Sequence, residues 1–76
     1  MSKLDPLSLK LYISVVTEKS IAAAAMRHHI AATAVGKRMS DLEESLGATL
    51  LRRTNRGVEA TDAGNALFSL AQSALN

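Results

Sequence analysis

The chain contains no cysteine and no tryptophan, and only one tyrosine and one phenylalanine among its 76 residues. Without cysteine it can form no disulfide, thiolate metal site or cysteine nucleophile, which is typical of a protein that stays in the reducing cytoplasm. Two aromatic side chains are too few for the stacking platforms that bind single-stranded nucleic acids. The start of the chain has no basic segment followed by an apolar run, and no stretch approaches the roughly 18 apolar residues of a membrane span. We therefore expect neither export nor membrane insertion.

Residues typical of catalytic and metal sites are also arranged unfavourably for such chemistry. His28 and His29 are adjacent, whereas two metal ligands on one helix are usually three or four residues apart. Ser20, Thr33 and Thr61 each precede or begin a helical pattern, and they are better explained as helix caps than as nucleophiles. The sequence therefore predicts no enzyme activity, no metal and no cofactor.

The charged residues are few in total, but they are separated by sign along the chain. The composition, with 47% hydrophobic and 21% charged residues, predicts one domain with one small core. Three basic residues and no acidic one occur between Arg27 and Arg38, and a second basic run follows after residue 50. One such run is usually a solvated surface. Two runs on either side of one helix indicate an anionic partner.

Three helices are predicted before residue 48. Asp5 and Pro6 are suited to the N-cap and first turn of a helix that extends to about residue 17. Ser20 precedes a short alanine-rich helix over residues 21–26. After a turn over residues 28–32, a third helix over about 33–46 ends at Gly47, with Thr33 suited to be its N-cap. Its apolar positions follow an i, i+4, i+7, i+11 pattern: Val35, Met39, Leu42 and Leu46.

The charges of this third helix run against its dipole. Acidic residues are favoured near a helix N-terminus and basic residues near its C-terminus, yet Lys37 and Arg38 precede Asp41, Glu43 and Glu44. Phosphate groups at the N-terminal half would offset the cost, because their neutralisation releases counterions. We therefore expect the two bases at phosphates and the three acids away from them.

The period of the pattern changes after Gly47. Residues 49–51 and 58–60 are short β-like runs on either side of Arg-Arg-Thr-Asn-Arg-Gly, which predicts a two-stranded hairpin with a basic tip at 52–57. Thr61 is placed to cap a last helix, which has no charged residue after Asp62. A helix this apolar in so small a domain predicts a partner helix.

This order of elements predicts a mainly α fold, the winged helix-turn-helix. Residues 1–60 would form a three-helix core with a small β-hairpin wing, and residues 61–76 would begin a linker or dimerisation helix. In such folds the third helix enters the DNA major groove, and the wing lies on the minor groove or the backbone. The hypothesis requires the bases of the third helix and the arginines of the wing to point to one side of the molecule.

Spaced motifs over residues 7–75 resemble the N-terminal DNA-binding domain of LysR-type transcriptional regulators: Ser20-Ile21, Ala24-Ala25, Ala34-Val35 with Lys37, then LEESLG, LLRRTNRGV and TDAG. The resemblance implies binding to double-stranded promoter DNA as a homodimer through the last helix. In such regulators a C-terminal effector-binding domain follows. The 76 residues do not extend to such a domain, so a small-molecule effector is expected only if the full-length protein has one.

The resemblance also implies site residues. Where the family commonly has Ser-Gln-Pro, this chain has Ala31-Ala32-Thr33, and Gly36 stands where serine is common. Fewer polar side chains are then available to read base edges, and apolar contact with a thymine methyl is a form of base recognition that these residues can still make. His28 replaces a leucine, and its imidazole needs a hydrogen-bond partner or contact with solvent. The expected DNA contacts are Ser20, Ala31, Ala32, Thr33, Ala34, Gly36, Lys37, Arg38, Arg53, Thr54 and Arg56, and the expected dimer contacts are Ala63, Leu67, Leu70, Ala71 and Ala74.

An alternative remains open from the residues alone. The chain could be a helical protein-interaction or dimerisation module that uses its last helix and does not bind DNA. Salt distinguishes the two functions, because binding through several Lys and Arg contacts to phosphates weakens steeply as salt rises, whereas apolar docking does not.

Overall fold

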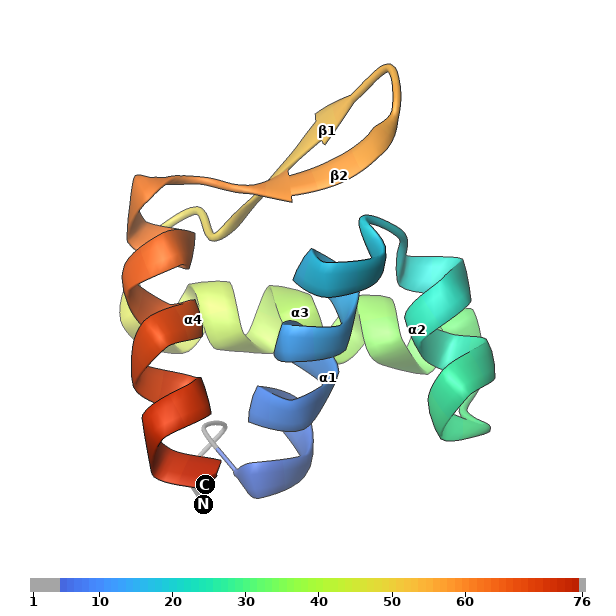
Figure 1. Ribbon diagram of the computed structural model, residues 1–76, viewed down its shortest axis with the longest axis horizontal. Coiled ribbons are helices and arrows are strands. Elements are labelled where there is room, and N and C mark those ends of the chain that lie inside the picture. The colour runs from blue at the N-terminus through green and yellow to red at the C-terminus, as the bar shows by residue number, and fades with distance from the viewer. Residues whose placement is uncertain (1–4, 76) are drawn as a thin grey trace.

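The computed structural model describes residues 5–75 and contains the elements in the predicted order (Figure 1). Three helices are followed by an antiparallel two-stranded hairpin and a fourth helix, so the fold is mainly helical. The elements are α1 (Pro6–Glu18), α2 (Ile21–His28), α3 (Ala32–Leu46), β1 (Leu51–Thr54), β2 (Gly57–Ala60) and α4 (Asp62–Leu75).

Three of the four predicted helix caps are confirmed. In each, a side-chain oxygen accepts a hydrogen bond from the backbone amide three residues later, as an N-cap requires. The prediction for Thr33 is wrong, because α3 begins at Ala32 and Ala31 occupies the N-cap position without a side-chain hydrogen bond. The confirmed caps are Asp5 to Ser8 at 2.7 Å, Ser20 to Ala23 at 3.0 Å and Thr61 to Gly64 at 3.0 Å.

The first two helices are each about one or two residues longer than predicted. Their C-cap residues are Lys19 and His29, which adopt left-handed backbone conformations with φ of 58° and 56°. Such a conformation is usually supplied by glycine, so these two helix ends could not be predicted from the residues. At the end of α3, Gly47 has φ of 62° as predicted.

The hairpin strands lie nearer the turn than predicted, because β1 covers residues 51–54 rather than 49–51 and β2 begins at Gly57 rather than Val58. Arg52 and Arg53 lie within β1, opposite Glu59 and Val58, so only Arg56 of the three arginines lies at the turn. The Arg52 guanidinium pairs with the Glu59 carboxylate at 3.1 Å, and such cross-strand pairs favour continued strand pairing.

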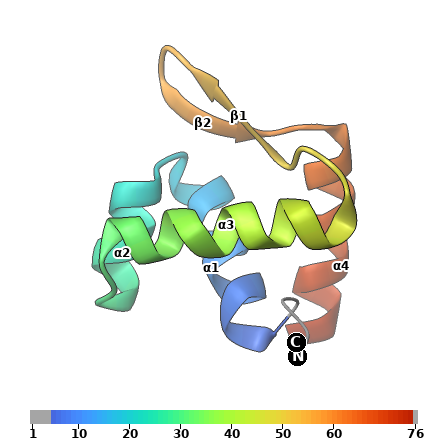
Figure 2. The ribbon, with the colours of Figure 1, turned by 180° about the vertical axis from the view of Figure 1, so that it is seen from behind.

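Helix α1 lies at the centre of the domain and contacts α2, α3 and α4. In both views the hairpin stands on one side of α3, and the start of α1 lies on the other side (Figures 1 and 2). The core between the helices and the base of the hairpin buries ten hydrophobic residues: Leu11, Tyr12, Val15, Ala24, Ala25, Val35, Met39, Leu42, Leu50 and Val58.

Helix α4 divides the residues predicted to form a dimer interface. Ala71 is 1% exposed, and Leu67 is half-buried against the core. These two residues therefore pack within their own chain, and the prediction that they face a partner is wrong for Ala71, because α4 needs that face to cover α1. Ala63, Leu70 and Ala74 lie on the exposed face, where Leu70 is 68% exposed.

Candidate nucleic-acid interface

The N-terminal part of α3 presents a face of small residues. Ala31, Ala32, Thr33 and Ala34 are exposed, and no side chain caps the helix start. Inward-facing Val35, Met39 and Leu42 anchor the same helix in the core. A helix end of this kind can approach a groove closely and offer backbone amides to an anion.

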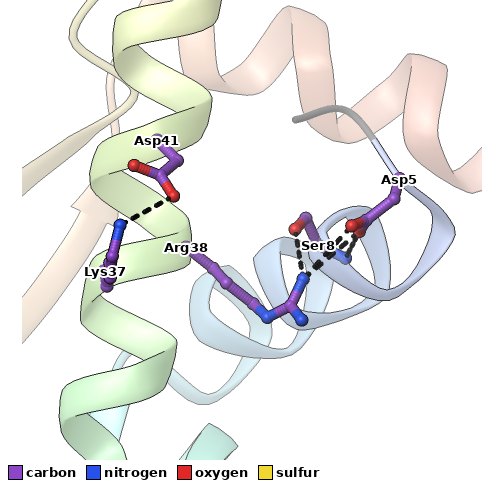
Figure 3. A network of polar contacts seen from close by, with 5 residues as sticks. All are labelled: Asp5, Ser8, Lys37, Arg38 and Asp41. Carbon is purple, nitrogen blue, oxygen red and sulfur yellow. Dashed lines mark hydrogen bonds and ion pairs between the residues drawn. The ribbon is translucent and has the colours of Figure 1, made fainter. Parts of the chain in front are cut away.

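The two basic residues of α3 leave the helix in different directions (Figure 3). Lys37 Nζ lies 3.3 Å from Asp41 Oδ2, and the Lys37 side chain is 76% exposed. Arg38 Nη1 instead reaches the start of α1, where it lies 3.2 Å from Asp5 Oδ2 and 3.1 Å from Ser8 Oγ. Consecutive helical residues point about 100° apart, since a turn takes about 3.6 residues.

The expectation of a single cationic side is therefore wrong for Arg38. Its partners lie at the start of α1, on the side of α3 away from the hairpin (Figures 2 and 3). Hydrogen bonds from the Ser8 amide and hydroxyl lower the pKa of the Asp5 carboxyl, and the Arg38 guanidinium lowers it further. Asp5 thus stays ionised and able to hold Arg38. Contact between Arg38 and phosphate remains a prediction.

Two arginines of the hairpin differ from Lys37 and Arg38 in their ion pairing. Arg53 and Arg56 are exposed, and within residues 5–75 the structure records an ion pair for neither of them. At the turn, Thr54 Oγ1 accepts a hydrogen bond from the Arg56 amide at 3.2 Å. Thr54, predicted to contact DNA, is thus engaged in shaping the turn that displays Arg56.

A depression between α3 and β1 joins residues from both predicted clusters. Its volume is about 320 Å³. Gly36 and Arg53 line it, together with Ser40, which the sequence analysis missed. Ser40 follows Gly36 by four residues and therefore shares its helix face, so helical spacing could have identified it. The remaining lining residues are Ile21, Met39, Glu43 and Leu51.

Two further residues have structural partners. The Ser20 hydroxyl caps α2, and its predicted contact with phosphate remains a prediction. The imidazole Nε2 of His28 lies 2.6 Å from Ser14 Oγ, so this histidine has one of the two environments expected for it, a hydrogen-bond partner.

The described part of the chain contains few other features of a functional site. Within residues 5–75, no group of three or more histidine, aspartate and glutamate residues is arranged to hold a metal ion. Over the same residues, none of the helices combines the length and apolar character needed to cross a bilayer.

Known proteins resemble this chain in sequence. The family model for bacterial regulatory helix-turn-helix proteins of the lysR family matches residues 7–65. The transcriptional regulator TcbR of Pseudomonas sp. (strain P51) is 41% identical over 64 residues, which are 84% of this chain and 22% of TcbR. The nitrogen assimilation regulatory protein nac of Escherichia coli (strain K12) is 40% identical over 88% of this chain and 22% of its own length. The chain thus spans less than a quarter of these relatives.

Solved structures resemble it in fold. The DNA-binding domain of CbnR, a LysR family transcriptional regulator, in complex with DNA has a TM-score of 0.90 and 38% identity, covering 95% of this chain and 83% of that one. The complex of the BenM DNA-binding domain with benA site 1 DNA has a TM-score of 0.89 and 32% identity, covering 95% and 84%. With the family model matching most of its length, the chain belongs to the lysR family of bacterial regulatory helix-turn-helix proteins.

Proposed function

We propose that this chain binds double-stranded promoter DNA sequence-specifically as the DNA-binding part of a transcriptional regulator. One observation carries the proposal: the uncapped, small-residue start of α3 lies on the same domain as two exposed hairpin arginines that lack an ion pair within residues 5–75. The likeness to DNA-binding domains solved on DNA supports it. Residues 1–60 form the DNA-binding domain in this proposal, and residues 61–76 begin the linker helix.

The proposed contacts divide into two kinds. Thr33 and its alanine neighbours meet base edges in the major groove, where a thymine methyl offers an apolar contact. Arg53 and Arg56 meet phosphates, which fix the position of the protein but carry no sequence information. Lys37 exchanges the Asp41 carboxylate for a phosphate, at little cost because exposed ion pairs contribute only about 0–1 kcal/mol.

The proposal also covers cell location and chemistry. A promoter-binding regulator acts in the cytoplasm and catalyses no reaction. An effector would bind only to a further domain of a longer protein.

Selection of bound duplexes from a random pool tests the proposal. The parent chain is expected to enrich one half-site sequence. Thr33→Ala is expected to change the base preferred at one or two positions by about 1–3 kcal/mol each, because its side chain reaches base edges. The measurement is deep sequencing of the selected pools followed by titration of single duplexes.

Two outcomes would contradict the proposal. The parent could enrich no sequence, or its binding could be insensitive to salt, as the alternative protein-interaction module requires. If the parent selects a half-site and Thr33→Ala selects the same one with the same preference, the assignment of Thr33 is wrong while DNA binding stands.

The exposed face of α4 is proposed to form a symmetric dimer. Leu70 is 68% exposed. Exposed residues of the same helix that lie three or four positions apart form one stripe: Ala63, Ala66, Leu70 and Ala74. Leu70→Glu would place an unpaired charge in that interface, so we expect a monomer by sedimentation where the parent is a dimer. Gln72→Glu adds the same charge at an exposed position outside the stripe and should leave the dimer intact. A parent chain that stays monomeric at high micromolar concentration would count against this interface.

A further inference from the structure

The carboxylate of Glu43 links α3 to the hairpin. Glu43 lies in α3, and its Oε2 accepts hydrogen bonds from the backbone amides of Leu50 at 2.7 Å and Leu51 at 3.2 Å. Hydrogen bonds to an ionised acceptor are about twice as strong as neutral ones. This link explains why an acid is favourable late in α3 despite the helix dipole.

The link continues along the strand to Arg53. Residues two apart in a strand place their side chains on one face, so Arg53 lies on the same face of β1 as Leu51. Both residues line the depression between α3 and β1, and so does Glu43 itself. The side chain that holds the start of β1 is therefore part of the surface from which Arg53 extends.

Both backbone polar groups of Leu50 are hydrogen-bonded. The Leu50 amide donates to Glu43, and the Leu50 carbonyl oxygen accepts hydrogen bonds from the Tyr12 hydroxyl at 3.0 Å and the Thr61 amide at 3.1 Å. Burial and, to a smaller extent, the Glu43 charge raise the pKa of Tyr12 to about 12, which keeps this hydroxyl protonated as a donor. The base of the hairpin is thus fixed to α1, α3 and α4.

A second attachment lies opposite Arg53. The register pairs Arg53 with Val58, and the Val58 amide donates to the Lys19 carbonyl at 3.1 Å, in the turn between α1 and α2. Arg53 therefore lies opposite the residue that bonds the hairpin to the turn between α1 and α2, one pair further along than the Arg52–Glu59 pair. Of these attachments, the bonds to Glu43 are the ones that a side-chain substitution in α3 can remove.

We propose that Glu43 is a positioning residue of the DNA interface: by tying the start of β1 to α3, it fixes the place of Arg53 and Arg56 relative to the base-reading face. The inference rests on the proposed function, because it concerns how the two contact regions are held together. Without the tie the hairpin is still held by Tyr12, the Thr61 amide and the Lys19 carbonyl, but no longer by α3. Its position relative to α3 is then less firmly fixed, and its phosphate contacts must be ordered at the moment of binding, which costs affinity.

Simple electrostatics predicts the opposite effect for the same substitution. A carboxylate near the duplex repels phosphates, so removing it should strengthen binding. Loss of the tie should weaken binding even though the chain becomes more positive. The sign of the change therefore distinguishes a positioning role from a charge effect.

The experiment measures affinity for a fixed duplex by fluorescence anisotropy over a range of salt concentrations, with the parent, Glu43→Gln and Glu43→Ala. Glu44→Gln is the matched control, since it removes the same charge one residue along α3. We expect about fivefold weaker binding for Glu43→Ala with a salt slope smaller by about 1, as for one lost phosphate contact. Glu43→Gln keeps a weaker acceptor and should lie between the parent and Glu43→Ala, whereas Glu44→Gln should bind as well as the parent or better.

A double-mutant cycle shows whether Glu43 acts through the hairpin arginines. In an Arg53→Ala/Arg56→Ala background, Glu43→Ala should cause no further loss, because there is no arginine left to position. All titrations are made below the unfolding temperature of each variant. If Glu43→Ala does not fold, the affinity of Glu43→Gln tests the inference in its place. Unchanged or tighter binding of Glu43→Gln and Glu43→Ala, or an equal loss in the arginine-free background, would overturn the inference. Failure of the parent to bind duplex DNA would instead refute the proposed function.

Discussion

Gly64→Ala is expected to destabilise the domain by about 3 kcal/mol or more, within the range of severe overpacking. A Cβ atom at Gly64 would overlap the Leu50 carbonyl oxygen and the Tyr12 hydroxyl. These two groups are hydrogen-bonded to each other in the core, so neither can move aside without breaking that bond. Folded domains are stable by only about 5–15 kcal/mol, so such a loss is a large share of the total.

Gly36→Ala is the matched control for this prediction. Gly36 is also in a helix, but nothing lies within 4 Å of a Cβ added there. Replacing it should stabilise the domain by up to about 1 kcal/mol, because glycine is a poor helix former. Chemical denaturation followed by circular dichroism measures both variants. If Gly64→Ala unfolds at the same denaturant concentration as the parent, the close packing of α4 on Tyr12 and Leu50 is wrong.

Arg53→Ala/Arg56→Ala is expected to weaken binding to every duplex by about tenfold at moderate salt, with a salt slope smaller by about 2. Both arginines are exposed and the structure records no internal ion pair for them within residues 5–75, so their charge is available to phosphates. Because phosphates carry no sequence information, the preferred half-site should stay the same. Anisotropy titrations on the selected half-site and on an unrelated duplex measure the change.

Arg52→Ala/Glu59→Ala is the control for the arginine pair. It also truncates two exposed hairpin side chains, but it removes an ion pair of 3.1 Å and leaves the net charge unchanged. We expect affinity and salt slope close to those of the parent. A similar loss in both double variants would indicate damage to the hairpin rather than lost phosphate contacts.

Local features were predictable from the sequence because their causes are local. A capping oxygen and the amide it binds are three residues apart, as at Asp5, Ser20 and Thr61. The prediction that Thr33 is an N-cap was wrong for an equally local reason, since α3 starts at Ala32 and Ala31 takes the N-cap position. The left-handed ends at Lys19 and His29 escaped prediction because these residues rarely adopt that conformation.

The partners of charged side chains could not be predicted in the same way. Arg38 and Asp5 are 33 residues apart, and only the packing of α3 on α1 brings them together. From the sequence we expected only that Glu43 lies away from the duplex, yet its carboxylate accepts hydrogen bonds from two amides that the turn at Gly47 brings back to α3.

By itself, the sequence determined that this chain makes four helices and a hairpin, since spacing, caps and turn residues act over a few positions, and its motifs indicated the family. Only the tertiary structure decided which charges remain for a partner. Ion pairs and buried faces depend on which helices meet, so Arg38 and Ala71 were engaged within the chain while Arg53, Arg56 and Leu70 were left exposed.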